Sequence, residues 1–154
     1  MSIAVQTQKK DKKYVPSIKA LTILCEQNYV CLRKLIPELS VDNTFTFILD
    51  NDVQYELSVL ECFKYTSIVQ FTQLGLDHTH FQLPRLQIRM YHDAKLAEVL
   101  ACQNISRIKP RYDYPNKDMM QPDEKWQVNM FLREWSEVCL RQGRVSVDLS
   151  PYRP

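Results

Sequence analysis

The apolar residues of this chain change their spacing twice, and this change most limits the fold that the chain can adopt. Between residues 44 and 92 they recur largely at every second position, which is the spacing of a strand with one buried face. On both sides of this run they recur at three- and four-residue steps, the spacing of an amphipathic helix. No helical segment separates the strands, so we expect them to pair antiparallel rather than through parallel crossovers.

The strand pattern predicts a meander of about five or six strands. The segment RLQIRMYH alternates cleanly, with leucine, isoleucine and methionine on one face and arginine, glutamine and tyrosine on the other. Asp50-Asn51-Asp52 predicts a tight turn between the first two strands. The expected strands are 44–50, 53–61, 65–74 and 85–92, then one strand or two short ones between 95 and 109, with 145–149 as a candidate closing strand.

Two helices are expected to cover one face of this sheet. The first spans roughly 16–36 and stops at Pro37, because proline cannot continue a helix. The second begins at Pro122, whose φ suits a first turn, and Gly143 is expected to end it in the left-handed conformation. The predicted fold is a single α+β domain over residues 14–150, preceded by a disordered basic tail at 1–13.

Charge and cysteine usage narrow the class of protein. The net charge of +2 comes from residues 9–13, KKDKK, while the rest of the chain holds 16 Lys/Arg and 17 Asp/Glu. The folded part is therefore nearly neutral, and nucleic-acid binding ranks last among the functions considered. Five cysteines without a two-residue spacing indicate reduced core thiols and a reducing compartment.

The location expected from the sequence is cytoplasmic. The first fourteen residues lack the apolar core of a signal peptide. The longest apolar runs fall far short of the roughly 20 residues that cross a bilayer, so no membrane association is expected.

The segment RYDYPNKDMM, residues 111–120, is the most function-like stretch. Arginine and tyrosine offer large contact areas with few rotatable bonds, and arginine grips carboxylate or phosphate with paired hydrogen bonds. We therefore expect a surface for an anionic ligand or an acidic partner segment. In a competing interpretation these side chains only anchor the loop through ion pairs and tyrosine hydrogen bonds. The candidate binding residues are Arg89, Tyr91, His92, Arg107, Lys109, Arg111, Tyr112, Asp113 and Tyr114.

Signals for catalysis are weaker. His92 and Asp93 are adjacent, which places them on opposite faces of a strand unless the strand has ended there. His78 and His80 could start a metal site with His92, although exposed loop histidines explain them as well. No serine or cysteine has the context of a nucleophile, and two glycines are too few for a phosphate-cradling loop. No catalytic residue, metal or cofactor is predicted.

Four segments resemble one known family: LCEQNYVCLRKLIP, YTSIVQ, RMYHDAKLAEV and RYDYPNKDMMQPDEKWQVNMFLREW. They are similar to the YqiB-like proteins, a bacterial domain of unknown function, over about residues 14–149. The resemblance implies a cytoplasmic bacterial single-domain protein, with residues 112–116 as a hallmark. It supplies no reaction, cofactor or catalytic residue.

The function expected from the sequence is a non-enzymatic binding or regulatory module that recognises a protein partner or an anionic small ligand. The alternative is a small enzyme acting on a phosphorylated or carboxylated metabolite with Arg89, His92, Asp93 and Glu98. The partner stays unknown and a homodimer is left open.

Overall fold

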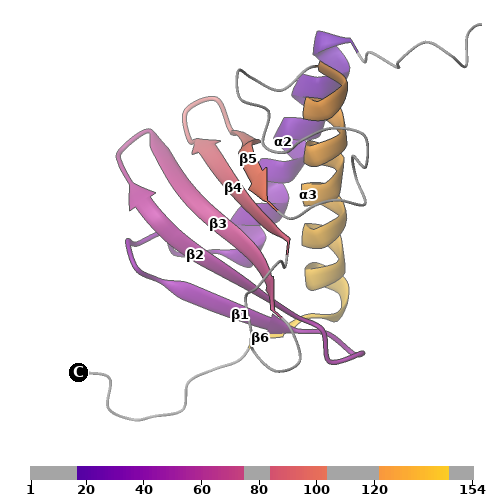
Figure 1. Ribbon diagram of the computed structural model, residues 1–154. Helices are drawn as coiled ribbons and strands as arrows, with labels where there is room; N and C mark the ends of the chain where they lie inside the picture. The colour runs from indigo at the N-terminus through magenta and orange to yellow at the C-terminus, as the bar shows by residue number, and fades with distance from the viewer. Residues whose placement is uncertain (1–16, 75–83, 104–121, 146–154) are drawn as a thin grey trace, which may run out of the picture.

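The described part of the chain forms a six-stranded antiparallel sheet with two long helices on one of its faces (Figure 1). The computed structural model describes residues 17–74, 84–103 and 122–145. The strand order is β5-β4-β3-β2-β1-β6, so the first five strands are a simple meander and β6 returns to pair with β1. The elements are α2 (Ile18–Leu35), β1 (Thr44–Ile48), β2 (Gln54–Cys62), β3 (Thr66–Leu74), β4 (Arg85–Tyr91), β5 (Leu96–Gln103), α3 (Pro122–Gln142) and β6 (Arg144–Val145).

The core lies between the sheet and the helices. Trp135 of α3 is its centre, with its ring 4.7 Å from that of Tyr55, 5.2 Å from Phe71 and 4.9 Å from Phe131. These aromatic pairs, in tilted or edge-to-face arrangements, stabilise the layer contact beyond the area that they bury. The strand residues that face them are almost fully buried, for example Leu57 and Ile88.

Asparagines join the helices to each other and to the sheet. The Asn129 Oδ1 atom of α3 accepts a hydrogen bond from the Val99 backbone N–H at 3.0 Å, so it satisfies a donor on β5, which is an edge strand. Asn28 of α2 donates from Nδ2 to the Asn129 carbonyl at 3.1 Å. Both side chains are buried, and their bonds fix α2, α3 and β5 relative to one another.

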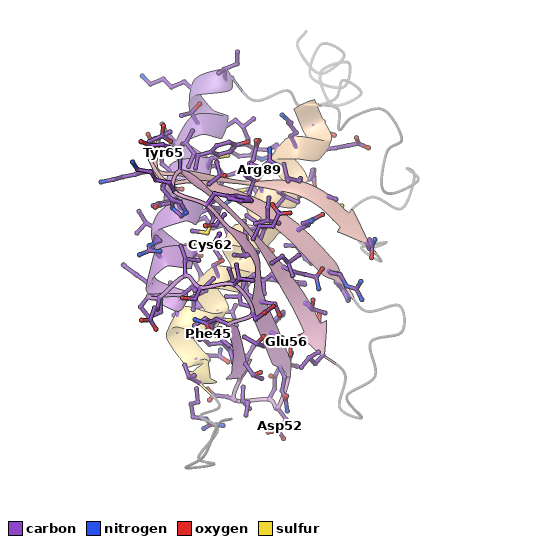
Figure 2. The ribbon with its side chains drawn as sticks, turned by 90° about the vertical axis from the view of Figure 1, so that its left-hand side faces the viewer. Phe45, Asp52, Glu56, Cys62, Tyr65 and Arg89 are labelled. Carbon is purple, nitrogen blue, oxygen red and sulfur yellow. The ribbon has the colours of Figure 1, made fainter. Side chains whose placement is uncertain are left out.

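The other face of the sheet is polar and faces away from the helices. Figure 2 shows Glu56 and Arg89 on this face. One row across it runs Glu61, Ile68, Arg89 and Glu98, from β2 to β5. A bulge at Leu60 in β2 and another at Leu100 in β5 shift the register.

The predicted fold class is confirmed. Within the residues that the structure describes there is one antiparallel sheet of six strands with an N-terminal and a C-terminal helix, which is an α+β fold. The predicted turn at Asp50–Asp52 is present, with Asp52 at φ 67°. The expected disordered tail at 1–13 and the segment 104–121 lie outside the described residues.

One prediction about a helix end is wrong. Gly143 does not have a positive φ, so it is not a left-handed stop. Its N–H donates to the Cys139 carbonyl at 2.8 Å, and a Cβ at this position would lie 2.5 Å from the same oxygen. Glycine is therefore required here by a close backbone approach.

Neither helix in the described part of the chain has the length and hydrophobicity of a membrane-spanning segment. The five cysteines are free; Cys25, Cys102 and Cys139 are buried, and the other two are half-buried. Burial raises the pKa of Cys25 to about 11 and that of Cys139 to about 12, so both remain thiols at neutral pH.

Candidate functional site

The predicted residues Arg89 and Tyr91 lie together on the outer face of the sheet. Both alternate outward from β4, as the sequence predicted. The Tyr91 hydroxyl donates to Glu98 Oε2 at 3.0 Å. Burial and the Glu98 carboxylate raise the pKa of Tyr91, and Arg89 partly opposes this rise. The polar groups of this cluster thus satisfy one another within the sheet. The other predicted binding residues, Arg107, Lys109, Arg111, Tyr112, Asp113 and Tyr114, lie outside the described residues.

His92 lies apart from Arg89 and Tyr91, on the side of the sheet that faces the helices. It follows the end of β4, and its backbone N–H donates to the Tyr65 carbonyl at 2.8 Å. Its Nδ1 atom lies 2.9 Å from the Tyr29 hydroxyl of α2, and its Nε2 atom lies 2.7 Å from Ser67 Oγ of β3. The imidazole therefore joins the helix, the β2–β3 hairpin and the β4–β5 turn.

A chain of hydrogen bonds continues from His92 through the hairpin. Ser67 Oγ lies 3.7 Å from Cys62 Sγ, which in turn donates to the Leu39 carbonyl at 3.4 Å. Figure 2 shows Cys62 and Tyr65 on the same side of the sheet as α2. The chain thus connects the segment after α2 with the imidazole.

The electrostatic surroundings favour neutral His92. Burial is the larger cause that lowers the pKa of His92, and the Arg33 guanidinium lowers it further, while Asp93 opposes both. Asp93 itself is exposed and accepts a hydrogen bond from the Ala94 N–H at 2.9 Å.

The close Ser67–His92 pair is not arranged for nucleophilic attack. A nucleophile must reach the substrate, whereas Ser67 has 0% of its surface exposed. Arg89 and Glu98 are cross-strand partners on the opposite face of the sheet from His92, so the four residues of the enzyme alternative do not converge on one site. No group of three metal-ligating side chains occurs among residues 17–74, 84–103 and 122–145. His78 and His80 lie outside these ranges.

A depression beside Tyr29 gathers positive charge. It has a volume of about 590 Å³ and is lined by Tyr29, Val30, Arg33, Lys34, Pro37 and Lys95. Arg33 and Lys34 come from the last turn of α2, and Lys95 comes from the β4–β5 turn. Lys95 has φ 59°, the left-handed region that is uncommon for a lysine, and this backbone conformation completes the tight turn. We call these six residues the basic depression.

No carboxylate of the described residues forms an ion pair with the three cations of the basic depression. The ion pair that the described residues do show, Arg133–Glu137 at 2.9 Å, lies on α3. Arg33 and Lys34 also offset the negative end of the α2 dipole, which explains part of their placement. Lys95 is on another element and has no such role, so the helix dipole alone does not explain the cluster.

Sequence reasoning missed this depression, although it singled out His92. A signal was present: Tyr29 and Arg33 are four positions apart, which places them on one face of the first helix. Lys95 could not be added from the sequence, because the β4–β5 turn reaches α2 only through the folding of the sheet.

Comparisons with known proteins identify relatives without an assigned activity. Residues 31–145 match the family described as "Protein of unknown function (DUF1249)". The chain is 38% identical over 136 residues to the "Uncharacterized protein YqiB" of Escherichia coli K12, which covers 88% of this chain and 97% of that protein. The same values hold for the proteins of that name in the O6:H1 and O157:H7 strains. No solved structure matches significantly. The resemblance to YqiB-like proteins is confirmed, and this chain belongs to the DUF1249 family of proteins of unknown function.

Proposed function

We propose that this protein is a non-enzymatic binding module whose basic depression recognises an oxyanion-bearing group, either phosphate or carboxylate. The observation that carries the proposal is the meeting of Arg33, Lys34 and Lys95 around one depression without an ion-pair partner among the described residues. Oxyanions are the ligands that such cations select, and arginine holds them with two parallel hydrogen bonds.

The hydrogen bonds that hold Tyr29 in the wall of the depression support the same proposal. Tyr29 is held at 2.9 Å by His92, which is held at 2.7 Å by buried Ser67. A preordered wall reduces the entropy lost on binding. The free thiols support a reducing cytoplasm as the place of this function. The surface predicted around residues 107–114 stays a prediction.

Two sources supply such a group: a free polyanion, or an acidic segment of a protein partner. Titration calorimetry with tripolyphosphate, which represents a free polyanion, and with an oligoglutamate peptide, which represents an acidic partner segment, distinguishes the two sources. The probe that binds more tightly indicates the source. The Lys34→Gln/Lys95→Gln double variant should bind the stronger probe about tenfold more weakly, the sum of two modest charge contacts.

The matched control for this titration removes two cations from elsewhere. Lys19 and Arg144 are exposed; Lys19 lies in the first turn of α2, at the opposite end of the helix from Lys34, and Arg144 lies on β6. A Lys19→Gln/Arg144→Gln variant therefore has the same net charge as the test variant and leaves the basic depression intact. It should keep the wild-type affinity. An equal loss in both variants would indicate attraction by net charge alone, and failure of both probes to bind the wild type would contradict the proposed function.

A further inference from the structure

We propose that the basic depression takes up one proton when it binds its anion, with His92 as the proton acceptor and the Tyr29 hydroxyl as the group that turns toward the anion. This inference rests on the proposed function and adds its regulation: acidification strengthens binding. It rests on the two hydrogen-bond partners of the imidazole, Tyr29 and Ser67, and on the tautomer that carries its proton at Nε2.

We assign the proton of neutral His92 to Nε2. In this tautomer Ser67 gives its hydroxyl proton to Cys62 Sγ, and Ser67 Oγ accepts from His92 Nε2–H across 2.7 Å. The Nδ1 atom then carries no proton and accepts from the Tyr29 hydroxyl across 2.9 Å. In this state the Tyr29 proton points at the imidazole, away from any ligand in the depression.

Protonation of His92 reverses the direction of the hydrogen bond between its Nδ1 atom and the Tyr29 hydroxyl. The added proton comes from solvent and goes to Nδ1, which now donates to the Tyr29 oxygen. The Tyr29 proton is released from that bond, and the hydroxyl rotates to donate to an oxyanion between Arg33 and Lys95. The bond from Nε2–H to Ser67 is unchanged, so the rest of the corner does not rearrange.

The charges around His92 determine the pH at which its imidazole becomes protonated. Burial and, after it, Arg33 from α2 oppose an imidazolium, and Asp93 of the same turn favours it. The hairpin faces the ring with the Ser67 hydroxyl, which contacts Cys62 Sγ. A bound anion compensates the Arg33 charge and accepts the Tyr29 proton. Both effects stabilise the imidazolium, so anion binding and protonation strengthen each other.

The test uses inorganic sulfate, whose charge is constant over the pH range used, and NMR titration of the full chain. The wild type should bind sulfate about tenfold more tightly near pH 5.5 than near pH 7.5, the contribution of a charge-assisted hydrogen bond. The His92 ring resonances should show a higher pKa at saturating sulfate than without it, a readout that a purely structural role would not change.

Two variants isolate the coupling. His92→Gln keeps hydrogen-bonding groups but cannot take up the proton, so its affinity should be the same at both pH values. Tyr29→Phe should lose most of the tenfold gain, whereas Lys95→Gln should bind more weakly at both pH values and keep the ratio.

The possible failures are distinguishable. Sulfate binding by the wild type that does not change with pH, or a pH dependence that persists in His92→Gln, would overturn the coupling and leave the proposed function standing. Absence of sulfate binding at both pH values would overturn both.

Discussion

At the scale of single residues, the position of His92 directly after the end of β4 determines which side chains it contacts. One residue earlier, Tyr91 points to the outer face and bonds Glu98. The next position points the other way, toward α2, where an imidazole finds the Tyr29 hydroxyl and Ser67 at hydrogen-bonding distance. The neighbouring residues Tyr91 and His92 therefore belong to two separate polar clusters on the two sides of the sheet.

The neutral state of His92 predicts a pH dependence of folding. Because the folded protein holds the pKa of His92 below its usual value of about 6.5, the unfolded chain binds more protons as pH falls through that value. The free energy of unfolding should therefore decrease on acidification below about pH 6.5 more steeply in the wild type than in His92→Gln. Urea denaturation of both proteins across this range, without added anions, measures the difference. A steeper decrease in the variant would show that the fold favours the imidazolium.

At the scale of elements, the sequence pattern does not determine the exact residue at which a helix begins or ends, and the backbone contacts at the helix ends do. The sequence placed the start of the first helix at Pro16, whereas the structure begins α2 at Ile18 with Ser17 as the capping residue. Ser17 Oγ accepts from the Ala20 N–H at 3.0 Å, which satisfies one of the free donors of the first turn.

Removal of this cap should destabilise the protein measurably. Ser17→Ala loses the acceptor for the Ala20 N–H and is expected to lower the free energy of unfolding by about 1 kcal/mol. Ser17→Asn restores an acceptor and should stay near wild type. Chemical denaturation of the three proteins decides the matter, and equal losses for alanine and asparagine would argue against a capping role.

The end of α3 offers a second element-level prediction. Gly143→Ala places a methyl group 2.5 Å from the Cys139 carbonyl oxygen, which is a backbone atom already bonded to the Gly143 N–H. The clash should cost roughly 1–3 kcal/mol, as for other forced contacts. Gln142→Ala, at the exposed neighbouring position, should change the unfolding midpoint little. A stable Gly143→Ala protein would mean that the helix end shifts freely.

At the scale of the whole molecule, the fold was predictable from the sequence, whereas the basic depression was not. The alternation in 85–91 and the helical steps around Trp135 are local patterns, so the sheet, the helices and most core residues follow from them. The bulge at Leu100 is a cross-strand register effect that the sequence alone does not show.

The basic depression arises only from tertiary structure. Arg33 and Lys95 are far apart in the sequence, and the two elements meet because α2 packs on β5 and Asn129 fixes α3 to the same strand. Sequence reasoning expected an anionic ligand or acidic partner but placed it around Arg89 and residues 107–114. Residues 107–114 lie outside the described residues and Arg89 lies beside the hydrogen-bonded Tyr91–Glu98 pair, so that surface stays a prediction. The cations near His92 have no ion-pair partners among the described residues.

The most direct test of the basic depression is a map of backbone amide shifts during titration with tripolyphosphate. The largest saturable changes should fall on residues 29–34 of α2 and 92–95 of the β4–β5 turn, and they should shrink in the Lys34→Gln/Lys95→Gln variant. Changes confined to the outer face around Arg89 and Tyr91, with residues 29–34 and 92–95 unmoved, would contradict the assignment of the site.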